Sequence, residues 1–243
     1  MKIIIPMAGR SKRYAEQEFI GQKAFIEIDG KPMVEHVVRL FPRNSEFIFV
    51  VRENDLNQRS RKILESLVPF YKIVAVNDAY LQGPLYSIQP AMDLVKDDEE
   101  VIVNYCDFTM VWDYNDFVSR ARSTACDAAV PTFRGFHPAS LVDTFYCYLK
   151  VDCDRVVDLR EKQPFTDNRL NEFASTGAYY FARGKLLKEY GQRAMTEEMR
   201  ISGEFYPTMA ILLMVRDSKK ILNYEVKKFI CFGTPRDYLI YKF

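Results

Sequence analysis

The chain has 243 residues, of which 48% are hydrophobic and 28% charged, so it is long enough for a substantial core and has an ordinary globular composition. Lysine plus arginine (34) nearly balances aspartate plus glutamate (33), which excludes the global basic field of a protein that binds nucleic acid or an anionic membrane. The longest apolar run, at 209–215, is far below the roughly 20 residues that cross a bilayer, and no signal peptide is evident, so we expect a cytoplasmic protein.

The first half of the sequence alternates strands with helices. The Ile-rich segment 2–7 has the composition of a parallel strand that is buried on both faces. Further strands are predicted at 46–51, 72–77 and 100–105, and helices are predicted from Pro32, from a cap at Asp55 or Asn54, and from Pro84. This alternation over about 110 residues indicates a parallel α/β sheet covered by helices.

The second half has a more antiparallel character. Tyr-, Phe- and Val-rich strands are predicted at 127–133, 144–152, 155–162 and 175–181, followed by helices at about 185–199 and 206–217. A closing helix should begin with Thr234 as cap, Pro235 at its first position and Asp237 at its third. No repeat or linker is evident, so we expect one domain over 1–243, with halves at 1–125 and 126–243.

The loop after the first strand combines a glycine with a group of cations: Arg10, Lys12, Arg13 and, after a gap, Lys23. Consecutive backbone N–H groups from Gly9 to Ser11 could form an anion-binding nest, and the cations could neutralise a triphosphate. The alternative is a solvated loop with scattered charges. Because ligands bind beyond the carboxyl ends of parallel strands, this loop and Asp107, which follows the fourth strand, should share one rim.

Metal-binding and disulfide chemistry find little support elsewhere in the sequence. No two cysteines form a C-x-x-C pair and the two histidines are isolated, which argues against a zinc site or a disulfide framework. We interpret the cysteines as core or incidental residues; they are Cys106, Cys126, Cys147, Cys153 and Cys231.

Several motifs together carry a family resemblance. The segments "IIIPMAGRSKRY" and "QKAFIEIDGKPMVEHVV" resemble the start of the sugar-phosphate nucleotidyltransferases, with their motif G-x-G-[ST]-R, then P-K-P, then G-K-P-[ML]-[IV]. Six later pieces follow in the family's order: "LQGPLYSI", "VIVNYCDF", "LREKQP", "STGAYYF", "GEFY" and "CFGTPRDY". The resemblance implies a Rossmann-like, three-layer α/β fold of the glycosyltransferase-A type with a mixed central sheet. It also implies the reaction of NTP with sugar 1-phosphate to give NDP-sugar and pyrophosphate, with Mg²⁺ as cofactor.

The resemblance assigns roles by motif position. Arg13 and Lys23 would stabilise phosphate charge, and Asp107 would bind Mg²⁺ with Asn104 as a supporting group. The nucleotide would contact Ala8, Gly9, Arg10, Ser11, Gln82 and Gly83, although Gln82 and Gly83 equally suit a helix cap before Pro84. The sugar phosphate would contact Glu161, Lys162, Gly177 and Glu204, for which ordinary strand-edge and helix-start roles are the alternative.

Three positions depart from the family pattern. Ser11 replaces the second glycine of the loop, and Gln22-Lys23-Ala24 replaces P-K-P. Many members carry a second metal-binding aspartate where this chain has Cys231. Either Asp107 and the phosphates hold the metal alone, or another carboxylate substitutes, or activity is reduced.

The expected function is therefore activation of a sugar 1-phosphate, or a similar phosphorylated compound, for capsule or lipopolysaccharide synthesis. No nucleic-acid or membrane partner is expected, and a homo-oligomer is one option for the assembly. Two alternatives stay open. One is a glycosyltransferase that uses an NDP-sugar, although such enzymes usually carry D-x-D where this chain has Cys106-Asp107-Phe108-Thr109. The other is a non-catalytic nucleotide-binding relative.

Overall fold

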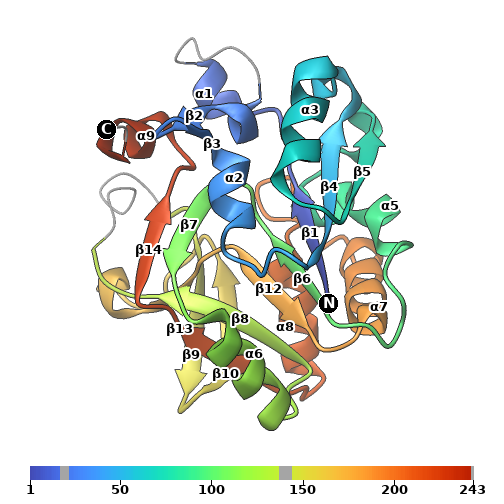
Figure 1. Ribbon diagram of the computed structural model, residues 1–243. Coiled ribbons are helices and arrows are strands. Elements are labelled where there is room, and N and C mark those ends of the chain that lie inside the picture. Colours follow the sequence, from blue (N-terminus) through green and yellow to red (C-terminus); the bar gives the residue numbers. More distant parts are fainter. Residues whose placement is uncertain (17–21, 137–143, 242–243) are drawn as a thin grey trace.

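The computed structural model describes residues 1–16, 22–136 and 144–241, without the side chain of Lys12, and shows a central sheet with helices on both sides (Figure 1). The main sheet of these residues has ten strands in the order β11-β9-β10-β13-β8-β12-β6-β1-β4-β5. Their bounds are β1 Lys2–Pro6, β4 Glu46–Arg52, β5 Tyr71–Val76, β6 Val101–Asn104, β8 Ala128–Phe133, β9 Cys147–Asp152, β10 Arg155–Glu161, β11 Phe173–Ser175, β12 Ala178–Phe181 and β13 Ile221–Glu225.

The sheet is mixed, as expected. β1 pairs in parallel with β4 on one side and with β6 on the other. β12 then joins β6 in the antiparallel sense and links it to β8, which pairs in parallel with β13. Two small sheets lie beside this one, formed by β2 (Glu27–Ile28) with β3 (Lys31–Pro32) and by β7 (Phe108–Val111) with β14 (Lys228–Cys231). The α/β prediction with a mixed central sheet is confirmed.

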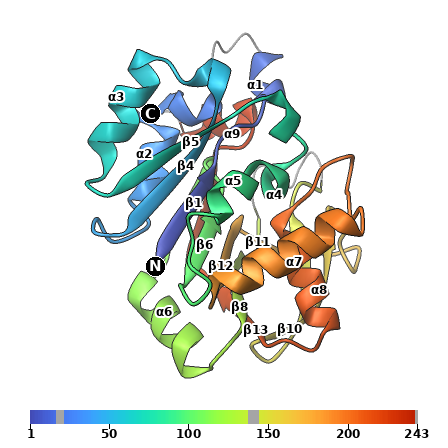
Figure 2. The same ribbon diagram turned by 90° about the vertical axis from the view of Figure 1, so that its right-hand side faces the viewer.

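The two faces of the sheet are covered by different helices, which makes three layers (Figure 2). Side chains alternate along a strand, so Ile3 and Ile5 join the core beneath α2, α3 and α6, while Ile4 joins the core beneath α4, α5, α7 and α8. This is why the first strand is apolar at every position after Lys2. The helix bounds are α1 Lys12–Ala15, α2 Met33–Val38, α3 Gln58–Leu67, α4 Pro84–Ser87, α5 Gln89–Met92, α6 Tyr114–Ser123, α7 Gly184–Thr196, α8 Pro207–Arg216 and α9 Pro235–Tyr241.

Several predicted helix and strand limits were wrong. The cap of α3 is Asn57, whose side chain accepts a hydrogen bond from the Ser60 N–H at 3.0 Å, and not Asp55 or Asn54. The helix expected from Pro84 is two short ones, because Pro90 has no N–H and its ring excludes an unbroken helix. The strand expected at 175–181 is interrupted at Gly177, which has a φ of +98°. The helix α6 is not predicted from the sequence.

The closing helix has the predicted cap. Thr234 Oγ1 accepts from the Asp237 N–H at 3.2 Å, and Asp237 Oδ2 accepts from the Thr234 N–H at 3.1 Å and from its hydroxyl at 2.7 Å. This reciprocal pair fixes the start of α9, which lies near α1, β2 and β3 (Figure 1). Tyr14, Phe232 and Tyr238 form a small separate core there, so α1 and α9 pack together.

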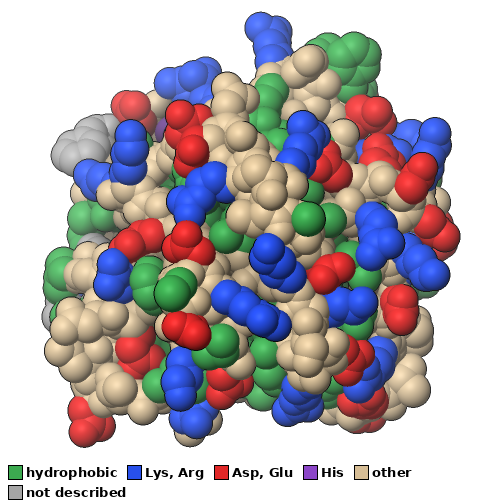
Figure 3. Space-filling model, turned by 90° about the horizontal axis from the view of Figure 1, so that it is seen from below, with side chains coloured by type: hydrophobic (Ala, Val, Ile, Leu, Met, Phe, Trp, Pro, Cys, Tyr) green, Lys and Arg blue, Asp and Glu red, His purple; other side chains and the backbone are tan. Residues whose placement is uncertain are grey.

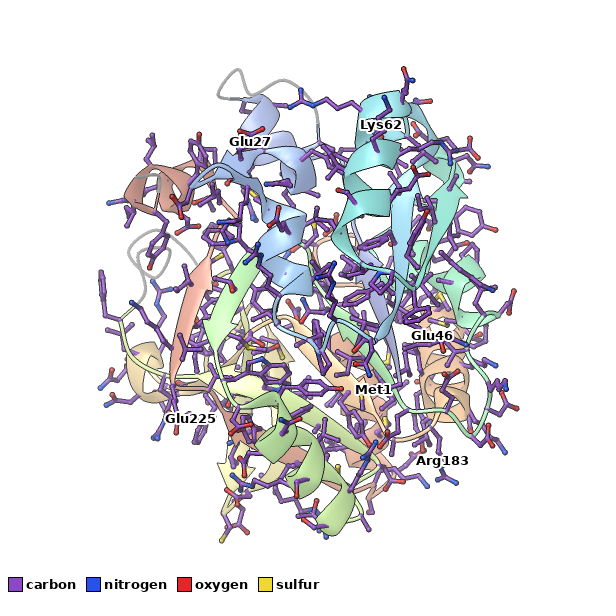
Figure 4. All side chains as sticks on the ribbon, viewed as in Figure 1. Met1, Glu27, Glu46, Lys62, Arg183 and Glu225 are labelled. Carbon is purple, nitrogen blue, oxygen red and sulfur yellow. The ribbon has the colours of Figure 1, made fainter. Side chains whose placement is uncertain are left out.

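The surface carries both charges. On the face seen from below, basic and acidic side chains intermingle (Figure 3). The charged residues labelled in Figure 4, such as Glu27, Lys62 and Glu225, are exposed at the periphery. Four cysteines are buried, as expected for core residues, whereas Cys153 is exposed. Among the described helices, none combines the length and apolar character needed to span a membrane.

Candidate active site

A cavity of about 700 Å³ lies beyond the carboxyl ends of β1 and β6. Parallel strands place their carboxyl ends at one edge of the sheet, so the loop after β1 and the residues after β6 meet there. Almost all the predicted site residues line this cavity: Ala8, Gly9, Arg10, Ser11, Arg13, Lys23, Gly83, Asp107, Glu161, Lys162, Gly177 and Glu204.

Two predicted residues lie elsewhere. Gln82 is absent from the cavity wall, because its side-chain amide donates to the Ala79 carbonyl at 3.2 Å and its Oε1 accepts from Arg200 at 2.9 Å. Asn104 is buried in β6 behind the wall. Gly83, with a φ of +111°, allows a close backbone approach: a Cβ there would stand 2.5 Å from the backbone N and O of Phe205. The side chain of Gln82, in contrast, bonds to Ala79 and Arg200 and does not line the cavity.

The loop after β1 explains the first departure from the family pattern. Ser11 has a φ of +51°, in the left-handed region that favours glycine, and it stands at the second glycine position of the motif G-x-G-[ST]-R. Its Oγ accepts a hydrogen bond from the backbone N–H of Lys23 at 3.0 Å. Ser11 therefore supplies a link that glycine lacks, and this link holds Lys23 without the two flanking prolines. Gly9 is exposed, and a Cβ there would meet no atom within 4 Å.

Lys23 and Asp107 form an ion pair at the cavity wall. Lys23 Nζ lies 2.6 Å from Asp107 Oδ2, and both side chains are mostly buried. Burial lowers the pKa of Lys23, but the neighbouring Asp107 carboxylate more than offsets this, so its pKa lies above the ordinary value and the amine stays charged.

Two arginines of the loop have different surroundings. The guanidinium of Arg13 lies over the ring of Phe145, 4.3 Å from its centroid, an arrangement that orients the cation. Arg10 is exposed and reaches Asp78 Oδ2 at 3.3 Å; Asp78 also pairs with Arg52 at 2.8 Å. The side chain of Lys12 lies outside the described part of the structure.

Part of the segment from Cys231 to Asp237 also lines the cavity. Tyr14 donates from its hydroxyl to the carbonyls of Phe232 (2.5 Å) and Thr234 (3.0 Å), and the Phe232 N–H donates to the Asp107 carbonyl at 2.7 Å. Gly233 leaves little room: a Cβ there would stand 3.1 Å from Cys231 Sγ and 3.2 Å from Asp107 Oδ2. The segment is therefore fixed against both Asp107 and α1, the short helix that follows the loop after β1.

A polar cluster lines the half of the cavity formed by β10 and the start of α8. Glu161 is buried, and its Oε2 accepts from Thr208 Oγ1 at 2.7 Å. Burial raises the pKa of Glu161 to about 7. Lys162 Nζ donates to the Tyr206 hydroxyl at 2.7 Å, and that hydroxyl donates to Glu204 Oε2 at 2.5 Å. This chain of contacts positions one ammonium and two carboxyl groups toward the cavity.

The sequence motifs do not predict several of the residues that line the cavity. Tyr14, Tyr105, Tyr146, Tyr206 and Asp237 line the wall but were interpreted, if at all, as core or helix-cap residues. A tyrosine in an apolar segment gives no signal of its own, because its ring packs like any aromatic. The buried Asp237 was recognised as a cap, and the cap motif itself was the signal that placed it near Cys231.

A divalent cation would find a suitable ligand in Asp107. Its carboxylate is a hard oxygen donor at the cavity wall, and the Lys23 ammonium already lies against it as a cation would. Within the described ranges, no group of three or more His, Cys, Asp and Glu side chains forms a ready-made metal site. Mg²⁺ in nucleotide sites is usually held by one or two carboxylates together with substrate phosphates.

Comparison with known proteins identifies relatives at the level of family and fold. A family model described as the MobA-like NTP transferase domain matches residues 3–198. No curated protein matches the sequence.

Similar solved structures include two nucleotide-sugar pyrophosphorylases and a CTP transferase. A nucleoside-diphosphate-sugar pyrophosphorylase from Vibrio cholerae RC9 aligns with a TM-score of 0.74 at 21% identity, over 98% of each chain. A UDP-glucose pyrophosphorylase from Acinetobacter baumanii gives 0.72 at 18% identity, over 98% of this chain and 90% of the other. An inositol-1-phosphate CTP transferase from T. maritima gives 0.73 at 16% identity, over 97% and 90%. At these identities the structures show a shared fold.

Proposed function

The chain belongs to the MobA-like NTP transferase family, and from this premise we propose that it transfers the nucleotidyl group of an NTP to a sugar 1-phosphate or a similar phosphorylated small molecule. One observation carries the proposal: a phosphate-binding type of loop, the Lys23–Asp107 pair and the Lys162 cluster face a single cavity. The structurally similar proteins described above are two nucleotide-sugar pyrophosphorylases and an inositol-1-phosphate CTP transferase, which supports this substrate class.

The proposed reaction needs no general base. A phosphate monoester has its second pKa near 6, so its oxygen is ionised at neutral pH and is already a nucleophile. That oxygen attacks the α-phosphorus of the NTP, the new O–P bond forms, and the bond between the α-phosphorus and its bridging oxygen breaks to release pyrophosphate. Catalysis then consists of positioning and charge neutralisation, which suits a wall of arginine, lysine and carboxylate side chains.

On the nucleotide side, the backbone from Ala8 to Ser11 would cradle the triphosphate, with Arg10 at its exposed end. Arg13, oriented by Phe145, and Lys23, held by Ser11, would neutralise charge that develops between the α- and β-phosphates. Asp107 would hold Mg²⁺, which when bound offsets further phosphate charge. Lys23 would exchange part of its contact with Asp107 for the incoming phosphates.

On the acceptor side, Lys162 would bind the sugar phosphate. The ammonium is held by the Tyr206 hydroxyl at 2.7 Å and therefore presents a fixed cation to a ligand in the cavity. Glu161 and Glu204 would bind sugar hydroxyls, and Gly177 would let the backbone lie against the sugar. In this proposal, residues 1–125 contribute the nucleotide half and 126–243 the sugar-phosphate half of one domain.

The proposal places the protein in the cytoplasm, where NTPs are available, and assigns its product to surface polysaccharide synthesis, in which NDP-sugars are donors. The test is thermal unfolding of the purified protein with ATP, GTP, CTP, UTP or dTTP, each with and without Mg²⁺. A ligand at 100 times its Kd adds about 2.7 kcal/mol to the free energy of unfolding. We expect one NTP to raise Tm clearly more than the other four, and we expect Mg²⁺ to enlarge this increase. No shift with any NTP, but a shift with NDP-sugars, would point instead to a glycosyltransferase.

A further inference from the structure

Asp237 has a carboxylate oxygen that the helix cap does not use. The residue is 0% exposed and lines the cavity. Its Oδ2 accepts both hydrogen bonds from Thr234, whereas its Oδ1 is buried and accepts from no N–H or O–H group of the described residues; the Cys231 thiol, a weak donor, is the other neighbour of this carboxyl group. Buried polar atoms nearly always have a partner, and an orphaned carboxylate oxygen at a cavity wall indicates a partner that arrives with a ligand.

The charge balance points to a cation. Asp107 and Asp237 both line the same wall, and the segment from Gly233 to Asp237 is fixed against Asp107 by the Phe232 N–H. The ammonium of Lys23 is paired with Asp107. Among the described side chains, no lysine or arginine forms an ion pair with Asp237. Two carboxylates therefore line this wall of the cavity, and the ammonium of Lys23 is paired with one of them, Asp107.

The sulfur of Cys231 is not a suitable second ligand for such a cation. It is buried and accepts a hydrogen bond from the Gly233 N–H at 3.2 Å. Mg²⁺ and Mn²⁺ take oxygen ligands and discriminate against sulfur. Asp237 lies on the same short segment and offers the oxygen that Cys231 lacks.

We infer that Asp237 is the second protein carboxylate for the divalent cation at Asp107, with Oδ2 capping α9 and Oδ1 serving the cation. This inference rests on the proposed function, because it assumes the nucleotide-bound cation. It also assigns a purpose to the Tyr14 hydroxyl, which holds the carbonyls of Phe232 and Thr234 and so fixes the distance between the phosphate loop and Asp237.

The test measures Mn²⁺ binding by electron paramagnetic resonance in the presence of a non-hydrolysable analogue of the NTP that gives the largest thermal shift. Asp107→Asn and Asp237→Asn should each weaken Mn²⁺ binding by about tenfold or more. The Asp237→Asn variant keeps a side-chain amide oxygen that still accepts from Thr234, so the cap survives. Thr234→Ala, which removes the capping hydroxyl but keeps the carboxylate, should lower Tm while Mn²⁺ affinity stays near the wild-type value.

A rescue variant makes the test specific. Cys231→Asp combined with Asp237→Asn returns a carboxylate to the same wall and should recover most of the lost Mn²⁺ affinity, whereas Cys231→Ser alone should leave it unchanged. Wild-type affinity in a folded Asp237→Asn variant, alongside weakened binding in Asp107→Asn, would overturn the inference and leave the proposed function standing. Absence of Mn²⁺ binding by the wild type with every NTP analogue would overturn both.

If Asp237→Asn does not fold, crystals of the wild-type protein with Mn²⁺ and the analogue decide the matter. An anomalous peak that places Mn²⁺ within bonding distance of Oδ1 of Asp237 supports the inference. A peak bonded to Asp107 without Asp237 overturns it.

Discussion

Lys23 Nζ lies 2.6 Å from Asp107 Oδ2, across 84 residues of sequence. The contact joins the 3-10 turn that begins at Lys23 to the segment that follows β6, so the two charges central to the proposed chemistry are already together in the free protein. In the proposed reaction, a phosphate group that enters between them would meet the Lys23 ammonium and the proposed metal ligand Asp107 at once. Each side chain also offsets the charge of the other before substrate arrives, and because both are partly exposed, solvent screens what charge remains.

Replacing Lys23 by Ala should lower kcat/KM for the NTP strongly, by about a hundredfold or more, because one donor of transition-state charge neutralisation is typically worth this much. Tm should fall only modestly, since an ion pair of this partial exposure adds little to the free energy of unfolding. Lys62→Ala is the matched control, because Lys62 is exposed on α3 (Figure 4). A large loss of Tm with unchanged kinetics would make Lys23 a structural residue.

Ser11 makes separable contributions through its backbone and its hydroxyl. Ser11→Ala keeps the left-handed φ of +51° but loses the 3.0 Å hydrogen bond to Lys23, and should cost about 1 kcal/mol, or about 2–4 °C in Tm. Ser11→Gly loses the same bond but removes the backbone strain, so its Tm should stay close to that of the wild type. Calorimetry of the two variants checks the order; equal Tm values would contradict it.

Replacing two glycines of the cavity by alanine should affect stability at one position and NTP binding at the other. Gly83→Ala places a Cβ 2.5 Å from the Phe205 backbone at a φ of +111°, so we expect a loss of about 3 kcal/mol or more in stability. Gly9→Ala meets no atom within 4 Å and should leave stability unchanged, yet raise KM for the NTP because the backbone must lie close to phosphate. Urea unfolding and initial rates measure the two effects. A destabilised Gly9→Ala variant would contradict this assignment.

Glu161 should make stability depend on pH. Burial raises its pKa from an ordinary value of 4.5 to about 7, so the folded state binds the proton more tightly than the unfolded state. Its favourable contribution is complete below pH 4.5 and is lost as the pH rises to about 7, on the order of 3 kcal/mol. Glu161→Gln, which cannot ionise, should remove this part of the decline in unfolding free energy between about pH 5 and 8. An identical slope in the variant would show that Glu161 does not titrate there.

Much of the fold follows from local sequence patterns. Ile3, Ile4 and Ile5 predict a strand buried on both faces, and such a strand requires helices in two layers. Thr234, Pro235 and Asp237 predict a helix start because capping depends only on neighbouring residues. The meeting of Gly9 and Asp107 at one cavity follows from the parallel pairing of β1 with β6, which the alternation of strands and helices already indicates.

Other features depend on contacts between distant segments. Gln82 resembles a site residue in sequence, but Arg200 holds its side chain away from the cavity. The second role inferred for Asp237 could not be predicted, because it requires knowing that one oxygen is used by the cap and the other is not. The need for glycine at position 177 likewise depends on Tyr105, whose ring would stand 2.8 Å from a Cβ there.

The most direct test of the account is pyrophosphate formation by the wild-type protein and by Asp107→Asn, with Asp98→Asn as an exposed control. The NTP found by thermal unfolding is offered with Mg²⁺ and a panel of hexose, amino-sugar and inositol 1-phosphates. We predict equimolar pyrophosphate and nucleoside diphosphate conjugate only when both substrates are present, and a rate lower by about a hundredfold or more in Asp107→Asn. Pyrophosphate formation at the wild-type rate by Asp107→Asn, or none from any pair although the NTP binds, would contradict the account.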